Sequence, residues 1–66
     1  MRMQYDEKAD ALYLRLDESP VVDSREVDPG VVLDFNANHQ VVGIEVLRLK
    51  ERVPSADLKQ IQFEVA

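Results

Sequence analysis

The chain contains no cysteine and no threonine, and it has a single histidine, His39. Without cysteine, neither a disulfide bond nor a thiolate zinc site can form. One histidine cannot build a histidine-rich metal site, and the serines fall in predicted turns or in an exposed strand, with only His39 to serve as a base. We therefore expect no catalytic residues, no resident cofactor and no enzyme activity.

The chain is also short, with 66 residues, which predicts a single domain over residues 1–66. A chain of this size buries only about 60 % of the surface that its unfolded form exposes, and its core rarely contributes more than roughly 3–5 kcal/mol. Because disulfides and thiolate metal sites are excluded, association with another protein is the remaining source of stability. We expect a homo-oligomer, or a complex with a second small protein.

Positive charge is scarce as well, and the formal net charge is −5. Residues 1–36 hold nine acids against four bases, whereas residues 37–66 hold four of each. This balance argues against nucleic-acid binding and suits a small basic protein partner. No apolar run approaches the ~20 residues of a membrane span, and residues 1–6 lack the apolar stretch of a signal peptide. We expect a cytoplasmic protein that binds no membrane.

Hydrophobic residues recur with a period of two, which predicts β-strands. Residues 11–16 show the pattern best, because leucines occupy one side and Ala11, Tyr13 and Arg15 occupy the other. Pro29 and Gly30 have the order that a type II turn requires, and residues 36–39 form a second predicted turn. The predicted strands cover residues 3–5, 11–16, 21–27, 31–35 and 41–49.

Gly43 lies inside the last of these strands, where glycine costs stability, so we expect an aromatic ring close to it or a β-bulge. Pro54 ends that strand, and Ser55 as an N-cap predicts a short helix over residues 56–60. Alternation over residues 61–65 suggests one more strand. The fold class is therefore mainly β (α+β), an antiparallel β-meander of about five to six strands with one short C-terminal helix. One face of such a sheet needs a cover, and a second copy could supply it.

Three ordered segments, Tyr5–Leu16, Gly30–Asp34 and Val42–Leu47, resemble the small prokaryotic family called domain of unknown function 2283. The resemblance covers residues 3–49. One departure is the turn before Val41, where the family usually has glycine and this chain has Asn38-His39. The resemblance implies a small, cytoplasmic, mostly β protein without assigned catalytic residues. Some family members look like antitoxin-type partners of small toxins, so it also suggests an antitoxin-like role.

A carboxylate group near the N-terminus is the best candidate for a ligand site. Asp6 and Asp10 would meet on one helical turn, and hard cations such as Mg²⁺ accept carboxylate oxygens. The alternative is that both side chains cap the turn by accepting backbone N–H groups around Ala9. Glu45 interrupts an otherwise apolar strand and could add a third oxygen ligand, or form a cross-strand pair with Arg15. A small-ligand or Mg²⁺-binding domain is therefore the alternative function.

Two further features have a functional and a plain structural interpretation. His39 could bind a metal or respond to pH, or it could be a solvated turn residue. Arg48, Lys50 and Arg52 would form a basic stripe along the last predicted strand. The stripe could guard an exposed strand edge, or it could bind the acidic half of another copy or an acidic protein. Our first hypothesis is a non-enzymatic protein-interaction module.

Overall fold

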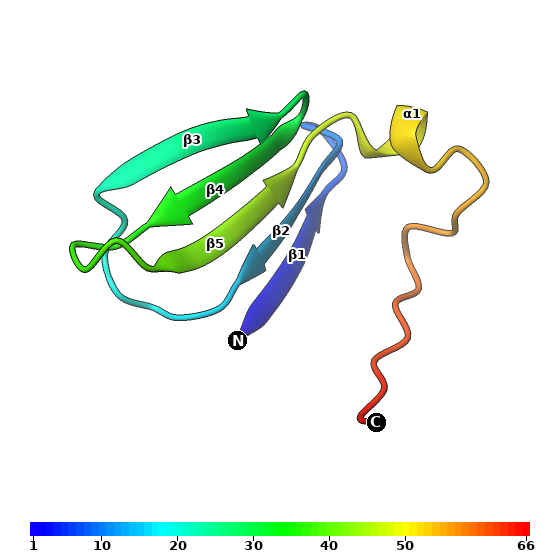
Figure 1. The fold of residues 1–66 in the computed structure, drawn as a ribbon. Coiled ribbons are helices and arrows are strands. Elements are labelled where there is room, and N and C mark those ends of the chain that lie inside the picture. The colour runs from blue at the N-terminus through cyan, green and yellow to red at the C-terminus, as the bar shows by residue number, and fades with distance from the viewer.

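The computed structural model describes residues 1–66 and contains one antiparallel sheet of five strands with one short helix (Figure 1). The antiparallel, mainly β fold with a short C-terminal helix is therefore confirmed. The elements are β1 (Arg2–Asp6), β2 (Ala11–Arg15), β3 (Asp23–Asp28), β4 (Val31–Phe35), β5 (Val41–Val46) and α1 (Leu49–Arg52).

The strand order is β1-β2-β5-β4-β3, so the sheet joins two units rather than forming one continuous meander. The β1–β2 hairpin is one unit, and β3, β4 and β5 form the other. The segment between β2 and β3 passes the ends of β5 and β4 to reach the opposite edge (Figure 1). Backbone hydrogen bonds attach it along the way, from Leu16 to Val42 over 2.8 Å and from Val22 to Phe35 over 2.8 Å.

The two predicted turns form where expected, each with one residue in the left-handed region. Gly30 has φ 77°, as the third residue of a type II turn requires, and it joins β3 to β4. In the β4–β5 turn, His39 has φ 61° and holds the left-handed position. The Asn36 side chain accepts the backbone N–H groups of Asn38 and Gln40, both over 3.0 Å, and so fixes this turn.

Gly43 has both features that its position predicts. A Cβ atom there would collide with the Tyr13 hydroxyl and lie 3.0 Å from the Asp34 carboxylate. Beside it, the register between β4 and β5 slips, because Asp34 faces Gly43 while Phe35 faces Val41. Val42 has no partner on β4 at this bulge, and it is only 2 % exposed. An aromatic ring and a bulge therefore both account for the glycine.

The C-terminal part differs from the expectation. Strand β5 ends at Val46, before residue 49, and α1 spans Leu49–Arg52 instead of residues 56–60. Arg48 turns the chain with φ 50°, and Leu49 is buried. The helix ends before Pro54 because the residue preceding proline disfavours helical backbone. Residues 61–65 form no strand, since none of their backbone groups pairs with the sheet.

Asp10 fastens α1 to the β1–β2 hairpin. Its carboxylate accepts the backbone N–H of Lys50 over 3.1 Å and the Tyr5 hydroxyl over 2.8 Å. Its backbone carbonyl accepts the N–H of Leu49 over 3.1 Å. Asp10 has φ 52°, a conformation that Asp and Asn tolerate better than most residues. This contact holds the start of the C-terminal segment beside the apolar side of β1.

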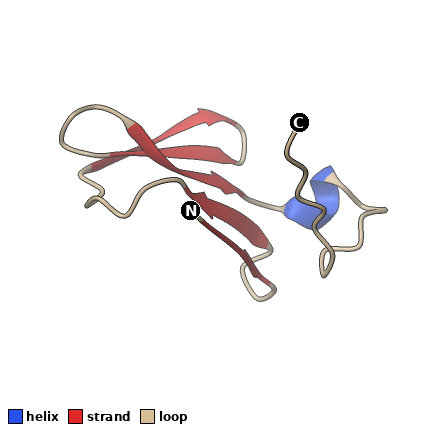
Figure 2. Cartoon of the chain, turned by 90° about the horizontal axis from the view of Figure 1, so that it is seen from below, coloured by secondary structure: helices blue, strands red, loops and turns tan.

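The sheet is a single layer, and α1 lies past the end of β5 rather than over either face (Figures 1 and 2). Only 6 of 66 residues are buried. The radius of gyration is 12.7 Å, larger than the ~11 Å of a compact chain of this length. No helix here has the length and apolar character needed to cross a bilayer. The chain therefore forms a sheet without a closed core.

Candidate functional site

The structure separates the three carboxylates that sequence analysis grouped. Asp6 accepts the N–H groups of Lys8 and Ala9 over 3.0 and 3.1 Å, which is the capping role weighed against metal binding. Asp10 points instead to Tyr5 and the start of α1. Asp6 and Glu45 do line one hollow of about 210 Å³, which Asp10 does not reach. No three His, Cys, Asp or Glu side chains come close enough together to hold a metal ion.

Glu45 does not form the expected pair with Arg15. The register places Glu45 opposite Tyr13, whereas Arg15 lies opposite Gly43. Arg15 turns toward the segment after β2, where its guanidinium donates to the backbone carbonyls of Asp17 and Ser19 over 2.6 and 2.5 Å. Arg15 is therefore bound by two backbone carbonyls. The alternation of residues along a strand could not predict these contacts.

The predicted basic stripe is divided by the helix. Residues two apart point in opposite directions on a helix, whereas residues four apart share a side. Arg48 and Arg52 accordingly line one hollow against Pro29, and Arg52 donates to the Pro29 carbonyl over 2.7 Å. Lys50 lines a different hollow beside Tyr5. The prediction that these three residues lie along a strand is wrong, because β5 ends at Val46. Their role in binding a partner stays a prediction.

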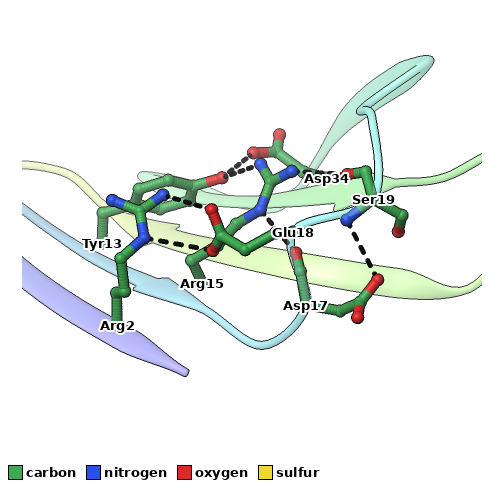
Figure 3. A network of polar contacts seen from close by, with 7 residues as sticks. All are labelled: Arg2, Tyr13, Arg15, Asp17, Glu18, Ser19 and Asp34. Carbon is green, nitrogen blue, oxygen red and sulfur yellow. Dashed lines mark hydrogen bonds and ion pairs between the residues drawn. The ribbon is translucent and has the colours of Figure 1, made fainter.

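One face of the sheet carries a connected polar network (Figure 3). The Tyr13 hydroxyl donates to Asp34 over 2.7 Å and accepts from Arg15 over 3.2 Å. The Ser24 hydroxyl donates to the other oxygen of Asp34 over 2.6 Å. This network links β2, β4 and β3 with the segment that crosses between the two edges. We call this side of the sheet the polar face.

The charges of this network fit their surroundings. Burial, and then the hydrogen bond to Asp34, raises the pKa of Tyr13 above 10.0. The Arg2 guanidinium donates two hydrogen bonds, of 3.0 and 3.1 Å, to the Glu18 carboxylate. These bonds raise the pKa of Arg2 and lower the pKa of Glu18 below 4.5. No buried polar side-chain atom lacks a partner. The polar face is therefore complete within one chain.

The opposite side of the sheet is apolar, and we call it the apolar face. Register places Leu14, Ile44 and Leu33 side by side across β2, β5 and β4. The apolar strand residues that the register assigns to this face are half-buried, except Met3 at the β1 margin, which is 45 % exposed. The apolar face comprises Met3, Tyr5, Leu12, Leu14, Val31, Leu33, Phe35, Ile44 and Val46.

The β3 margin of the apolar face carries its charged strand residues. The Arg25 guanidinium lies 4.3 Å from the centre of the Phe35 ring, a cation–π distance. Arg25 also pairs with Asp23 over 3.6 Å. Asp23 and Arg25 neutralise each other, and Asp28, opposite Val31 at the turn end of β3, leaves one negative charge at this margin. Most of the net charge of −5 therefore resides on the polar face, the turns and the chain ends.

The C-terminal segment borders the β1 margin of the apolar face (Figure 1). Ile61 and Phe63 line a hollow of about 400 Å³ together with Met1, Met3 and Leu14. Even so, Ile61 is 58 % exposed and Phe63 is 81 % exposed. The segment borders the apolar face without covering it.

The hydroxyl groups on the sheet are engaged in hydrogen bonds. The hydroxyls of Tyr5, Tyr13 and Ser24 each donate to a carboxylate, and His39 lies in an exposed turn at the end of β4. The uncovered face was expected from the residue pattern, whereas the Tyr13–Asp34 bond was not. The one signal for that bond was Gly43, which predicted a nearby aromatic ring without saying which one.

Comparison with known proteins gives one match. The family described as protein of unknown function (DUF2283) matches residues 2–50 of the chain, from the start of β1 into α1. A search of curated proteins and a search of solved structures each returned no match. The matched residues include both faces of the sheet, whereas residues 51–66 lie beyond them.

Proposed function

This chain belongs to the DUF2283 family of proteins of unknown function, and we propose that it acts as a protein-interaction module that pairs with a second copy of itself through the apolar face. The observation that carries the proposal is the exposed area of the single chain. The chain exposes 5158 Å², whereas a compact folded protein of 7.6 kDa exposes about 4,300 Å². The excess, roughly 900 Å², is similar to the ~800 Å² that each partner buries in an interface of standard size.

The charge distribution favours a second copy as the occupant. Two acidic molecules repel each other when their charged surfaces meet. The apolar face carries the balanced Asp23–Arg25 pair and, at the β3 edge, Asp28, so two copies can meet there while most of their net charge stays outside the contact. A small basic protein would instead be attracted to the acidic groups on the polar face and the turns. Twisted sheets that pack face to face lie about 10 Å apart and share one apolar core.

The shape of the face supports the same arrangement. Five strands spaced about 4.8 Å apart give a sheet roughly 24 Å wide, and five-residue strands are about 17 Å long. That footprint is apolar across β1, β2, β5 and β4, and its charged residues lie on β3. An isologous dimer would place the Leu14, Ile44 and Leu33 row of each copy against the same row of the other.

The test compares two neighbouring residues on β4 that point to opposite faces. Leu33→Lys places a charge on the apolar face, while Val32→Lys places the same charge on the polar face, opposite Glu26 and Glu45. Sedimentation equilibrium of the full chain should give a dimer of about 15 kDa, twice the mass of one chain. Leu33→Lys should weaken the dimer about 100-fold or more, and Val32→Lys should leave it within about threefold of the unaltered chain.

Circular dichroism should show that both variants keep the strand content of the unaltered chain. A full chain that stays monomeric across the dilution series contradicts the proposal. Equal weakening by the two variants contradicts the assignment to the apolar face. Binding to a small basic protein that persists in Leu33→Lys would place a heterologous partner, as an antitoxin-like role implies, on another surface.

A further inference from the structure

The C-terminal arm, residues 58–66, has an amphipathic pattern whose apolar side chains at positions 61, 63 and 65 stay largely exposed. Ile61, Phe63 and Val65 alternate with Gln60, Gln62 and Glu64. The apolar members are 58, 81 and 85 % exposed. On the other side, the Gln62 amide donates to Glu64 over 2.8 Å, so the polar side forms its contacts within the arm. An extended segment with one apolar side is suited to packing against an apolar surface.

The arm has no polar attachment to its own sheet. The hydrogen bonds of residues 56–66 join residues within that segment or reach Val53, and none reaches a strand. The hollow of about 400 Å³ between Phe63, Met3 and Leu14 remains open. By contrast, α1 is fastened at both ends, through Asp10 and through the Pro29 carbonyl. The fixed part of the C-terminal segment therefore ends before the arm begins.

We infer that the C-terminal arms are exchanged in the dimer, each arm packing its apolar side on the β1 margin of the other copy. This inference rests on the proposed pairing of the apolar faces. An arm of nine residues reaches about 30 Å when extended, which exceeds the ~10 Å that separates two packed sheets. The second copy presents the same hollow at Met3 and Leu14, and the arm leaves its own sheet without breaking a hydrogen bond.

Exchange also accounts for the exposed side chains around the hollow. Met1 and Met3 at the β1 margin are 82 % and 45 % exposed, although they are neighbours of the arm in the single chain. A sheet-to-sheet contact alone would leave this margin open, because β1 is an edge strand. An arm from the second copy would cover β1 and bury its own apolar side in the same contact.

The absence of cysteine makes a disulfide test unambiguous, because an introduced pair of cysteines is the only pair in the chain. Met3→Cys/Phe63→Cys places one thiol on each side of the hollow. Mild oxidation at concentrations where the chain is dimeric should give a covalent dimer on a non-reducing gel. The matched control is Met3→Cys/Val27→Cys, because Val27 is also exposed, at 56 %, but lies on β3 at the far edge. The control should give at least about fivefold less covalent dimer.

A second measurement keeps the failure of this inference separate from that of the proposed function. Phe63→Ser should weaken the dimer about tenfold or more, because an aromatic ring is then missing from the interface. Gln62→Ser, on the polar side of the arm, should change the affinity less than about threefold. A dimer whose Met3→Cys/Phe63→Cys variant forms only disulfides within one chain overturns the exchange and leaves the pairing intact. A dimer that Phe63→Ser does not weaken also overturns the exchange, whereas a full chain that never dimerises overturns the pairing itself.

Discussion

The two faces of the sheet are formed by the same five strands but are stabilised in different ways. On the polar face, Tyr13, Asp34 and Arg15 satisfy one another and hold the crossing segment in place. On the apolar face, Leu14, Ile44 and Leu33 share a row that the chain buries only in part. Polar side chains can be satisfied by a few neighbours and by water, whereas an apolar surface is stabilised only by removal from water. The polar face is therefore complete within one chain, whereas the proposed association would bury the apolar face.

The largest effect should come from filling the space above Gly43. Gly43→Val would push the Tyr13 ring away and break its bonds to Asp34 and Arg15. We expect a loss of about 3 kcal/mol in the free energy of unfolding, measured by urea denaturation. The loss should be the same at all chain concentrations, because the polar face lies within one chain.

The Gly43 effect has an internal control. In a Tyr13→Ala background the ring is absent, and Gly43→Val should then cost at least about 1 kcal/mol less than in the unaltered chain. Equal costs in the two backgrounds would show that the ring does not explain the glycine.

A smaller effect is expected on the apolar face. Ile44→Ala removes methyl groups from the middle of the row that includes Leu14 and Leu33. We expect a loss of about 2 kcal/mol where the chain is dimeric and much less where dilution makes it monomeric. Val32→Ala, on the other face of β4, is the control and should show no such dependence. Equal losses for Ile44→Ala at high and low concentration would remove the distinction between the faces.

Alkaline pH should affect both faces through their tyrosines. Burial, and then the bond to Asp10, raises the pKa of Tyr5 from 10.0 to about 12. A raised pKa in the folded state means that this stabilisation is complete below pH 10 and is lost as pH rises toward 12. Tyr13 has a shift of the same sign. Tyr5→Phe should make the stability fall less steeply over this pH range. In an ultraviolet titration, the variant should lack the phenolate signal of Tyr5.

The Tyr5 prediction can be checked against its counterpart on the polar face. Tyr13→Phe should also reduce the alkaline fall, although it breaks the bond to Asp34 and lowers stability at neutral pH. A phenolate of Tyr5 that forms near pH 10 would contradict its burial and its bond to Asp10.

The smallest effect should come from the exposed pair at the start of β1. Hydrogen bonding to Arg2 lowers the pKa of Glu18 below 4.5. The stabilisation from this lowered pKa is therefore present above pH 4.5 and is lost as pH falls through the lower folded-state value. Glu18→Gln should make the stability slightly less sensitive to acid, measured by thermal unfolding at several pH values. Because both side chains are more than half exposed, high salt should reduce the difference, and a salt-independent effect would argue for another cause.

The sequence was most informative where a residue imposes a local constraint. Pro29-Gly30 specified a turn, and Gly43 specified a close aromatic neighbour, because each restricts the backbone or the space beside it. Alternation located the strands, but it could not show that β2 pairs with β5 rather than β3. That choice involves contacts between distant parts of the chain, such as the backbone hydrogen bonds from Leu16 to Val42 and from Val22 to Phe35, which no local pattern encodes.

The C-terminal third shows the same limit. Ser55 and Pro54 suggested a helix over residues 56–60, yet the helix forms at Leu49–Arg52, where Asp10 and a buried Leu49 hold it. The alternation of residues 61–65 predicted an extended conformation but not its partner. The apolar face was foreseen as a surface in need of a cover because length and composition alone limit the core.

The measurement that tests the central claim most directly is the unfolding midpoint of the full chain as a function of its concentration. Thermal unfolding should be followed by circular dichroism over at least a 100-fold range of concentration, with the mass determined at each end. Pairing through the apolar face predicts a midpoint that rises steadily with concentration and a mass that approaches twice 7.6 kDa. A monomer whose midpoint is the same at every concentration would contradict it.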